Sequence, residues 1–378
     1  MIKNTGKSIR IIQITQVMLL IFTIISCTHT HNTSEVDIVI KDSNYSLGSH
    51  FTDFKLVSLS DTLSALLRDP VKMYVSNSHI YVYDRSKNGI CDYDSVGNYL
   101  GTIGRVGHAA NEYVLMRNFS ISDSGDTIAI IQKRNIKYYT KENRFIGKYD
   151  FPEDIFWEDI AFWNDNLLVA DFHRSNSNIL TLMDKNSRVL SNYFESTSDM
   201  LYYRPVIINN IQQDKNYICV CDFASSSFII IDKNTHSTEK ISLRSKNVLK
   251  EEYLTDPNFA DVNYDHIKSF VYSNGKIYGT FYSSTDNAGA FHGYSFILNV
   301  VSKKIETYES SDISPRFLYA SDDNFYMLIH PGLLIEAFQK NNPDYSCIKD
   351  LLQDAYNGLN KVVDETDNYY ILKMRAKE

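Results

Sequence analysis

The chain has 378 residues, 43% of them hydrophobic, and carries 46 acidic against 38 basic residues, which gives a net charge of −8. This acidic balance disfavours nucleic acids and anionic lipid headgroups as partners, because both repel a negatively charged surface. The length exceeds that of an average single domain but is ordinary for a repeat fold, and abundant Tyr and Phe supply a sizeable core.

The N-terminus has the pattern of a bacterial lipoprotein signal peptide. Three basic residues precede an apolar run over residues 11–25, which is shorter than the roughly 20 apolar residues of a membrane-spanning helix. The run ends in Ile-Ile-Ser-Cys, which resembles the lipobox, where cleavage precedes a cysteine that is then lipidated. We therefore predict a signal peptide over residues 1–26 and lipidation of Cys27.

Cys27 and the polar residues after it are expected to form a tether. We predict that residues 27–34 are the lipidated cysteine and this tether, and that residues 35–378 form a single domain. Cleavage removes three basic and no acidic residues, so the net charge of the mature chain becomes −11. We interpret His29 and His31 as solvated linker residues rather than as metal ligands, and we expect membrane contact through the lipid alone.

Short strands recur along the chain at a spacing of about 40 to 50 residues, which is typical of propeller blades. The clearest copy, residues 71–104, alternates four runs rich in β-branched and aromatic residues with turns of Asn, Gly, Ser and Asp. Four strands joined by such turns form one antiparallel blade. The same pattern returns at residues 119–151, 160–195, 205–243 and 267–310.

The two ends of the chain together supply a sixth copy. Residues 317–329 hold two strands, residues 368–374 hold one, and residues 54–59 hold another. Residues 343–363 have the apolar spacing of a helix. Pairing strands from both ends of the chain closes a ring and removes the exposed sheet edge. The sequence thus predicts an all-β fold, a six-bladed β-propeller with a short helical insertion in the last blade.

The strongest local signature lies at the end of the first copy. It reads Ile-Tyr-Val-Tyr-Asp at 80–84, Tyr-Asp-Ser-Val-Gly-Asn-Tyr-Leu at 93–100, and then a glycine-rich loop at 101–113. On these residues the chain resembles the six-bladed β-propeller lipoproteins of Bacteroidota, which are related in architecture to NHL and TolB-type propellers. The resemblance implies a fold and an envelope location, with no agreed activity. The loop departs from that family's Gly-Pro-Gly-Glu-Tyr ending, because Ala, Ala and Asn precede Glu112 and Tyr113.

Candidate binding residues come from two places. Arg105, Glu112 and Tyr113 belong to the glycine-rich loop, where the first two could pair or line the mouth of the central channel. Trp157 and Trp163 belong to an aromatic cluster whose faces could stack on sugar rings, although aromatics between blades more often fill the core. We predict no catalytic residue, no metal ligand and no cofactor.

The cysteines of the mature domain leave the redox state open. Cys91, Cys219, Cys221 and Cys347 could form up to two disulfides in any of three connectivities. Cys219 and Cys221 would share one face of a strand, which disfavours a bond between them. Buried reduced thiols are the preferred interpretation.

Two functions stay open on the sequence. The preferred one is a monomeric, non-enzymatic binding or scaffolding propeller of the cell envelope, whose partner is a protein, a peptide or a glycan. The alternative is a hydrolase or lyase that holds Ca²⁺ in the central channel. Asp171, His173 and Asp222 follow second strands, from which channel-facing ligands could come. Surface-exposed lipoproteins of Bacteroidota commonly carry an acidic run just after the lipidated cysteine, and residues 28–32 are not acidic, so the resemblance implies an outer-membrane anchor with the domain on the periplasmic face.

Overall fold

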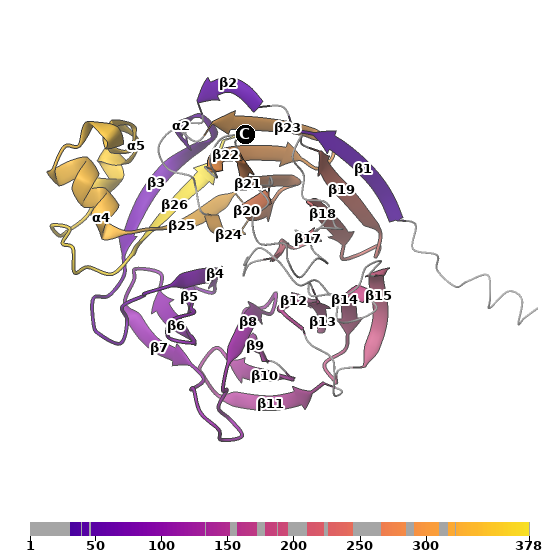
Figure 1. Ribbon diagram of the computed structural model, residues 1–378. Helices are drawn as coiled ribbons and strands as arrows, with labels where there is room; N and C mark the ends of the chain where they lie inside the picture. The colour runs from indigo at the N-terminus through magenta and orange to yellow at the C-terminus, as the bar shows by residue number, and fades with distance from the viewer. Residues whose placement is uncertain are drawn as a thin grey trace, which may run out of the picture.

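The computed structural model arranges the chain as six β-sheets around a central axis (Figure 1). It describes residues 31–38, 40–44, 47–132, 134–151, 157–171, 178–186, 188–195, 210–222, 226–244, 266–284, 291–309, 317–321 and 323–377. Cys27 and His173, which carried predictions, lie outside these residues. The six sheets confirm the predicted six-bladed β-propeller.

The first three blades are four-stranded antiparallel sheets built from consecutive strands. Blade 1 consists of β4 (Pro70–Ser76), β5 (His79–Asp84), β6 (Gly89–Asp94) and β7 (Tyr99–Ile103); blade 2 of β8 (Met116–Ile121), β9 (Thr127–Gln132), β10 (Asn135–Thr140) and β11 (Phe145–Asp150); blade 3 of β12 (Asp159–Trp163), β13 (Asn166–Ala170), β14 (Asn178–Met183) and β15 (Val189–Glu195). In blade 2 the inner strands are buried because neighbouring blades cover both faces, whereas the outermost strand β11 is largely exposed. The turn-rich breaks in the sequence coincide with these strand ends.

The last three blades repeat this plan and close the ring. Blade 4 consists of β16 (Ile211–Gln213), β17 (Tyr217–Asp222), β18 (Ser227–Asp232) and β19 (Thr238–Arg244); blade 5 of β20 (His266–Ser273), β21 (Lys276–Ser284), β22 (Phe291–Asn299) and β23 (Lys304–Glu309); blade 6 of β24 (Phe317–Ser321), β25 (Asn324–Ile329), β26 (Tyr370–Ala376) and β3 (Phe51–Ser58). Buried Asn368 fixes the closure, since its side chain accepts from the Leu67 N–H and donates to the Ser60 carbonyl, both at 2.9 Å. The predicted pairing of strands from both ends of the chain is confirmed.

Two N-terminal strands extend the outer edges of blades 4 and 5. β1 (His31–Asp37) and β2 (Ile40–Asn44) pair in parallel with β19 and β23. The Arg244 guanidinium holds β1 through Glu35 and Asp37, at 2.7 and 2.9 Å. Residues 31–34 therefore belong to a sheet, which corrects the predicted tether of 27–34. Their polar sequence gives no local strand signal. They form a strand because they pair with β19, which lies about 200 residues away in the sequence.

The helical insertion lies between β25 and β26, as predicted. It contains α4 (Pro331–Leu334), the π-helical turn η2 (Ile335–Gln339), the 3₁₀ turn η3 (Pro343–Tyr345) and α5 (Ser346–Asn357), and a short helix α2 (Leu47–His50) precedes β3. Ile348 and Leu352 of α5 are buried against blade 6, and Figure 1 shows the insertion on the outside of the ring beside β3. No helix in the described part of the chain is long and apolar enough to cross a membrane.

The cysteines of the domain are all free thiols. Cys91, Cys219 and Cys221 are buried, as expected, and burial raises the pKa of each thiol above its ordinary value. Cys347, in α5, is exposed, so the prediction of a buried thiol is wrong there. The three buried cysteines pack as small apolar residues.

Candidate ligand-binding site

The glycine-rich loop after β7 extends outward between blades 1 and 2 (Figure 1). Tyr113 is fully buried, and its hydroxyl donates to the Ile103 carbonyl at 3.1 Å. The Glu112 carboxylate accepts from the Ala109 N–H of its own loop at 3.0 Å. Arg105 is exposed, and within the described chain no ion pair joins it to Glu112. These residues shape the loop at the rim of the ring, and not the mouth of the channel.

Both tryptophans lie in the core between blades. Trp157, which is 4% exposed, packs edge-on against Phe151. Trp163, which is 1% exposed, stacks on Tyr193 and donates from Nε1 to the Lys233 carbonyl at 3.0 Å. Neither ring presents a face to a sugar at the surface, so the structure places both in the packing role.

The inner strands bring an ion pair into the centre of the ring. Lys72 of β4 and Asp159 of β12 are both buried, with Nζ and Oδ1 separated by 3.0 Å. Asp159 also accepts from the backbone N–H groups of Asn210 and Ile211, each at 3.0 Å. Burial acts to lower the pKa of Lys72, but the attraction of Asp159 outweighs it, and the pKa lies above its ordinary value. The pair connects blades 1, 3 and 4.

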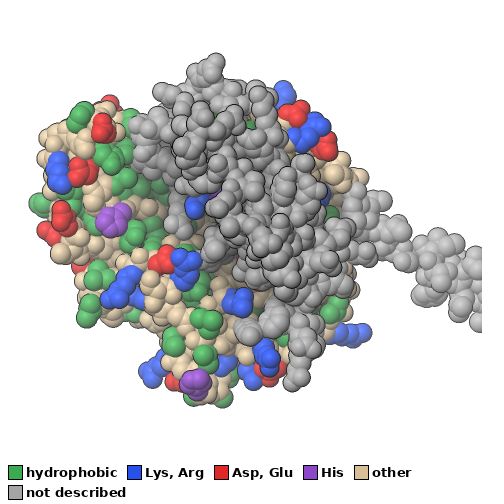
Figure 2. Space-filling model, in the orientation of Figure 1, with side chains coloured by type: hydrophobic (Ala, Val, Ile, Leu, Met, Phe, Trp, Pro, Cys, Tyr) green, Lys and Arg blue, Asp and Glu red, His purple; other side chains and the backbone are tan. Residues whose placement is uncertain are grey.

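The remaining predicted positions are polar groups at strand ends. Asp171 and Asp222 are buried at the ends of the second strands of blades 3 and 4, and Lys240 Nζ lies 3.9 Å from Asp222. Among the described residues, no group of three or more His, Cys, Asp and Glu side chains is placed to hold a metal ion. Figure 2 shows basic and acidic side chains interspersed over the described part of one face of the ring.

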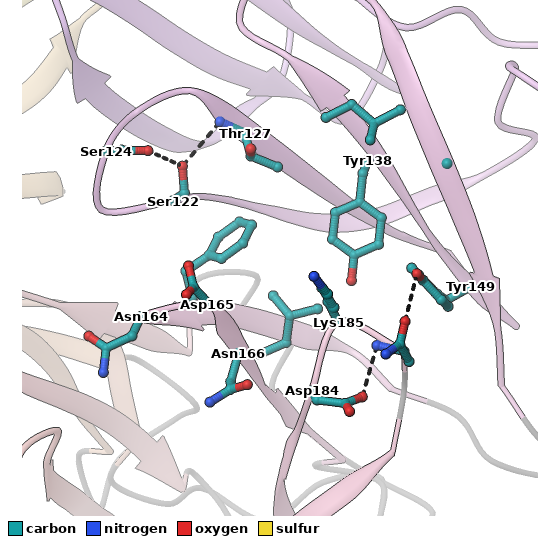
Figure 3. A pocket seen from close by; sticks show the side chains of 15 residues that line it. Ser122, Ser124, Thr127, Tyr138, Tyr149, Asn164, Asp165, Asn166, Asp184 and Lys185 are labelled. Carbon is teal, nitrogen blue, oxygen red and sulfur yellow. Dashed lines mark hydrogen bonds between the residues drawn. The ribbon is translucent and has the colours of Figure 1, made fainter.

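A cleft of about 570 Å³ lies between blades 2 and 3 (Figure 3). It is bounded by β10 and β11 of blade 2 and by two turns of blade 3, residues 164–166 and residues 184–186. Aromatic and apolar side chains line it together with carboxamides, hydroxyls, two carboxylates and one ammonium group. Its volume falls within the range of roughly 300–1,000 Å³ that ligand pockets occupy.

Tyr138 and Gly147 form one side of this cleft. Tyr138 is 7% exposed, and its hydroxyl points into the cleft with no hydrogen-bond partner in the described chain (Figure 3). Burial raises the pKa of Tyr138 well above its ordinary value, so the hydroxyl stays protonated at neutral pH and can donate. Gly147 lies opposite Tyr138 in the strand pair, and a Cβ added there meets no atom within 4 Å. The glycine leaves the space over the tyrosine open.

Hydrogen bonds hold the other wall in place. The Tyr149 hydroxyl of blade 2 donates to Asn186 Oδ1 of blade 3 at 3.0 Å. Asp184 Oδ1 accepts from the backbone N–H groups of Asn186 and Arg188 at 2.8 and 2.9 Å, which fixes the turn. The cleft is thus shaped before any ligand enters.

Three side chains of the cleft keep their polar groups available. Asp165, Asn166 and Lys185 make no hydrogen bond or ion pair through their side chains within the part of the chain that the structure describes. They come from two turns of blade 3 and offer a carboxylate, a carboxamide and an ammonium group. Together with the Tyr138 hydroxyl they provide donors and acceptors on two walls.

The sequence alone does not reveal this cleft. Its residues lie in the copies at 119–151 and 160–195, where the pattern predicts only strands and turns. An alignment of the copies could have indicated the cleft. Ser122 of blade 2 aligns with Trp163 of blade 3, and Gly147 of blade 2 aligns with Ser191 of blade 3. Small residues at two neighbouring positions of one copy indicate missing volume between blades.

Comparison with known proteins supports the fold over nearly the whole chain. A Bacteroides fragilis protein named as an exported protein has 13% identity and a TM-score of 0.70, over 91% of this chain and 100% of that one. A member of the duf4221 family from Bacteroides vulgatus has 11% identity and a TM-score of 0.50, over 87% and 98%. No curated protein matches. Residues 26–283 match the model of DUF5128, described as a 6-bladed beta-propeller, and the chain belongs to that family.

Proposed function

We propose that this protein is a lipid-anchored binding propeller of the cell envelope, which holds a ligand in the cleft between blades 2 and 3. The buried Tyr138 hydroxyl, which has no partner among the described residues, is the observation that carries this proposal. Leaving such a group unpaired costs about 1–3 kcal/mol, and a ligand that accepts its hydrogen bond recovers that energy. The described lining residues offer hydroxyls, carboxamides, carboxylates and an ammonium group, which can hold a ligand through hydrogen bonds.

Anchoring at the periplasmic face of the outer membrane is part of this proposal. The signal-peptide pattern and Cys27 support it, and a B. fragilis protein with the same fold is named for export. Since β1 begins at His31, three residues separate it from Cys27. A fully extended link of this length spans at most about 14 Å, so the domain stays close to the membrane surface.

Replacing Cys27 tests the anchor. In a Bacteroidota host, wild-type protein is expected in the membrane fraction and labelled by radioactive palmitate. Cys27→Ser is expected to abolish the label and to move the protein out of that fraction. A Cys27→Ser protein that stays labelled and membrane-bound would refute lipidation at this residue.

A matched pair of variants tests the cleft. Gly147→Trp fills the space over Tyr138, whereas Lys148→Trp places the same ring on the opposite face of β11. Full-length protein in detergent is offered neutral oligosaccharides, acidic oligosaccharides and short peptides as three probe classes. We expect at least one class to bind the wild-type and Lys148→Trp proteins but not Gly147→Trp. Binding that is equal in all three proteins would place the ligand elsewhere and refute the proposal.

The same preparation tests the calcium alternative. Its metal content and its melting temperature are measured with and without a chelator. One stoichiometric Ca²⁺ whose removal lowers the melting temperature would favour the hydrolase or lyase function over simple binding.

A further inference from the structure

We infer that the ligand of the cleft between blades 2 and 3 is a neutral oligosaccharide. This inference rests on the proposed function, because it names the chemical class that the same site accepts. Four features of the cleft lead to it: its apolar surface, its available polar groups, its charge and its rigidity.

The apolar part of the cleft matches the C–H faces of sugar rings. Ile146 of blade 2 lines it and is exposed, and the buried side chains of Phe162 and Leu167 of blade 3 line it beside the ring of Tyr138. Because Gly147 carries no side chain, a planar ligand can approach the tyrosine along β11. Aromatic side chains with one polar end suit ligands that are apolar on one face and hydroxylated at the edge.

The polar part matches hydroxyl groups. Each sugar hydroxyl both donates and accepts, so it is best held by donors and acceptors placed together. Tyr138 and Lys185 donate, Asp165 accepts, and the Asn166 carboxamide does both. None of the four groups has a hydrogen-bond partner in the described chain. The Tyr138 oxygen is buried, and Figure 3 shows the tyrosine hydroxyl and the lysine directed into the same space.

The charge of the cleft argues against acidic ligands. Asp165 and Asp184 bring two negative charges and Lys185 brings one positive charge, so the described lining carries a net charge of −1. A phosphate, sulfate or uronic acid group would have to approach two carboxylates with a single cation to offset them. A neutral sugar makes the same hydrogen bonds without this repulsion.

The rigidity of the walls favours a ligand that binds through several weak contacts. The Tyr149–Asn186 bond joins the two blades, and the Asp184 turn is fixed by two backbone hydrogen bonds. A site that is already ordered loses little side-chain entropy on binding. Sugars, whose single contacts are weak, gain most from such preorganisation.

An array of neutral oligosaccharides tests the ligand class. It spans α- and β-linked glucose, galactose, mannose and N-acetylglucosamine trisaccharides, with sialylated and sulfated oligosaccharides and tripeptides as competing classes. We expect a neutral trisaccharide to bind the full-length protein, Gly147→Trp to weaken binding at least tenfold, and Lys148→Trp to leave it unchanged. Tyr138→Phe, which removes one hydroxyl and keeps the ring, is expected to weaken binding about 3- to 10-fold.

The outcomes separate this inference from the proposed function. Binding of only an acidic sugar or a peptide, blocked by Gly147→Trp, would overturn the neutral-sugar inference and leave the binding cleft standing. No binding of any class, or binding indifferent to Gly147→Trp and Tyr138→Phe, would overturn both. If Gly147→Trp does not fold, as judged by circular dichroism, Tyr138→Phe alone decides, because it preserves the packing.

Discussion

Two junctions between neighbouring blades have the same backbone pairing but opposite packing. Blade 2 meets blade 3 at the cleft, and blade 3 meets blade 4 at a closed contact. Gly147 opposes Tyr138 in blade 2, and Ser191 opposes Leu182 at the matching position of blade 3. In both blades the pairing shifts by one residue next to this pair. The two junctions are therefore copies of one another in backbone.

A tyrosine on the outer strand also repeats. Tyr149 of blade 2 bonds to Asn186 in the turn of the next blade at 3.0 Å, and Tyr193 of blade 3 lies 3.3 Å from His236 Nδ1 in the turn of blade 4. The difference lies on the inner strands. Trp163 stacks on Tyr193 and lies against His236, with centroid distances of 6.0 and 4.7 Å.

Ser122 occupies the position in blade 2 that Trp163 holds in blade 3. Trp163 pairs with Asn166 across the first turn of its blade, and the Ser122 N–H donates to the Thr127 carbonyl across the same turn of blade 2. The serine hydroxyl accepts from the Thr127 N–H at 3.0 Å and leaves the volume of an indole empty. One side chain on an inner strand thus decides whether a junction is core or cleft.

The largest expected effect comes from opening the closed junction. Trp163→Ser removes a buried indole and its bond to Lys233, and we expect it to lower the free energy of unfolding by about 3–5 kcal/mol. Ser122→Ala, the control at the open junction, removes one part-buried hydrogen bond to Thr127 and one exposed hydrogen bond to Ser124, and should cost about 1 kcal/mol. Urea denaturation measures both. Equal losses of unfolding free energy in Trp163→Ser and Ser122→Ala would show that Trp163 does not close its junction.

The contrast between these junctions also marks how far sequence reasoning reaches. Strand positions and the number of blades could be predicted, because each blade is a local unit whose turns carry Asn, Gly, Ser and Asp. The tryptophans were placed in a cluster, but the spacing could not tell an interblade core from a surface. That choice depends on Tyr193 and His236, which come from other strands and another blade.

The cleft and the N-terminal strands depend on contacts between distant segments. Asp165 and Lys185 lie in turns whose composition predicts only a turn, and their availability depends on what blade 2 lacks opposite them. β1 likewise pairs with β19, far along the chain, so residues 31–34 looked like linker. Periodicity shows which segments form a sheet, but not what lies against its faces and edges.

Removing a tyrosine hydroxyl should change the free energy of unfolding in opposite directions at the two junctions. Tyr138→Phe removes a buried hydroxyl without a partner in the described chain, so we expect the free energy of unfolding of the ligand-free protein to rise by about 1 kcal/mol. Tyr193→Phe removes a hydroxyl within bonding distance of His236 and should lower it by about 1 kcal/mol. Thermal denaturation of the two variants in parallel checks the signs. A loss of stability in Tyr138→Phe would mean that its hydroxyl is paired.

A smaller, pH-dependent effect on stability is expected from Lys233, whose carbonyl accepts the hydrogen bond of Trp163. Its side chain is 2% exposed, with Nζ 3.4 Å from Asp123, and burial lowers the pKa of its ammonium below the ordinary value. The unfolded chain therefore holds this proton more tightly than the folded protein does. The stability contributed by Lys233 rises with pH from the pKa of the folded state up to the pKa of the unfolded state, which is about 10.4. We expect the stability of the wild type relative to Lys233→Met to increase between pH 8 and 10. A difference that falls over this range would contradict the direction of the shift.

The smallest expected effect concerns the glycine that keeps the cleft open. Gly147 has neither a left-handed backbone nor a neighbour that a Cβ would touch, so Gly147→Ala should raise the free energy of unfolding by about 0.5 kcal/mol through the unfolded chain. Gly279→Ala is the control, since its Cβ would lie 2.5 Å from Phe296 and should destabilise by about 1–3 kcal/mol. Urea denaturation measures both, and a loss of stability in Gly147→Ala would show that the glycine serves the fold. A gain in stability together with weaker oligosaccharide binding would mean that the fold does not require the glycine, and that its role is to keep the face of Tyr138 open to the ligand.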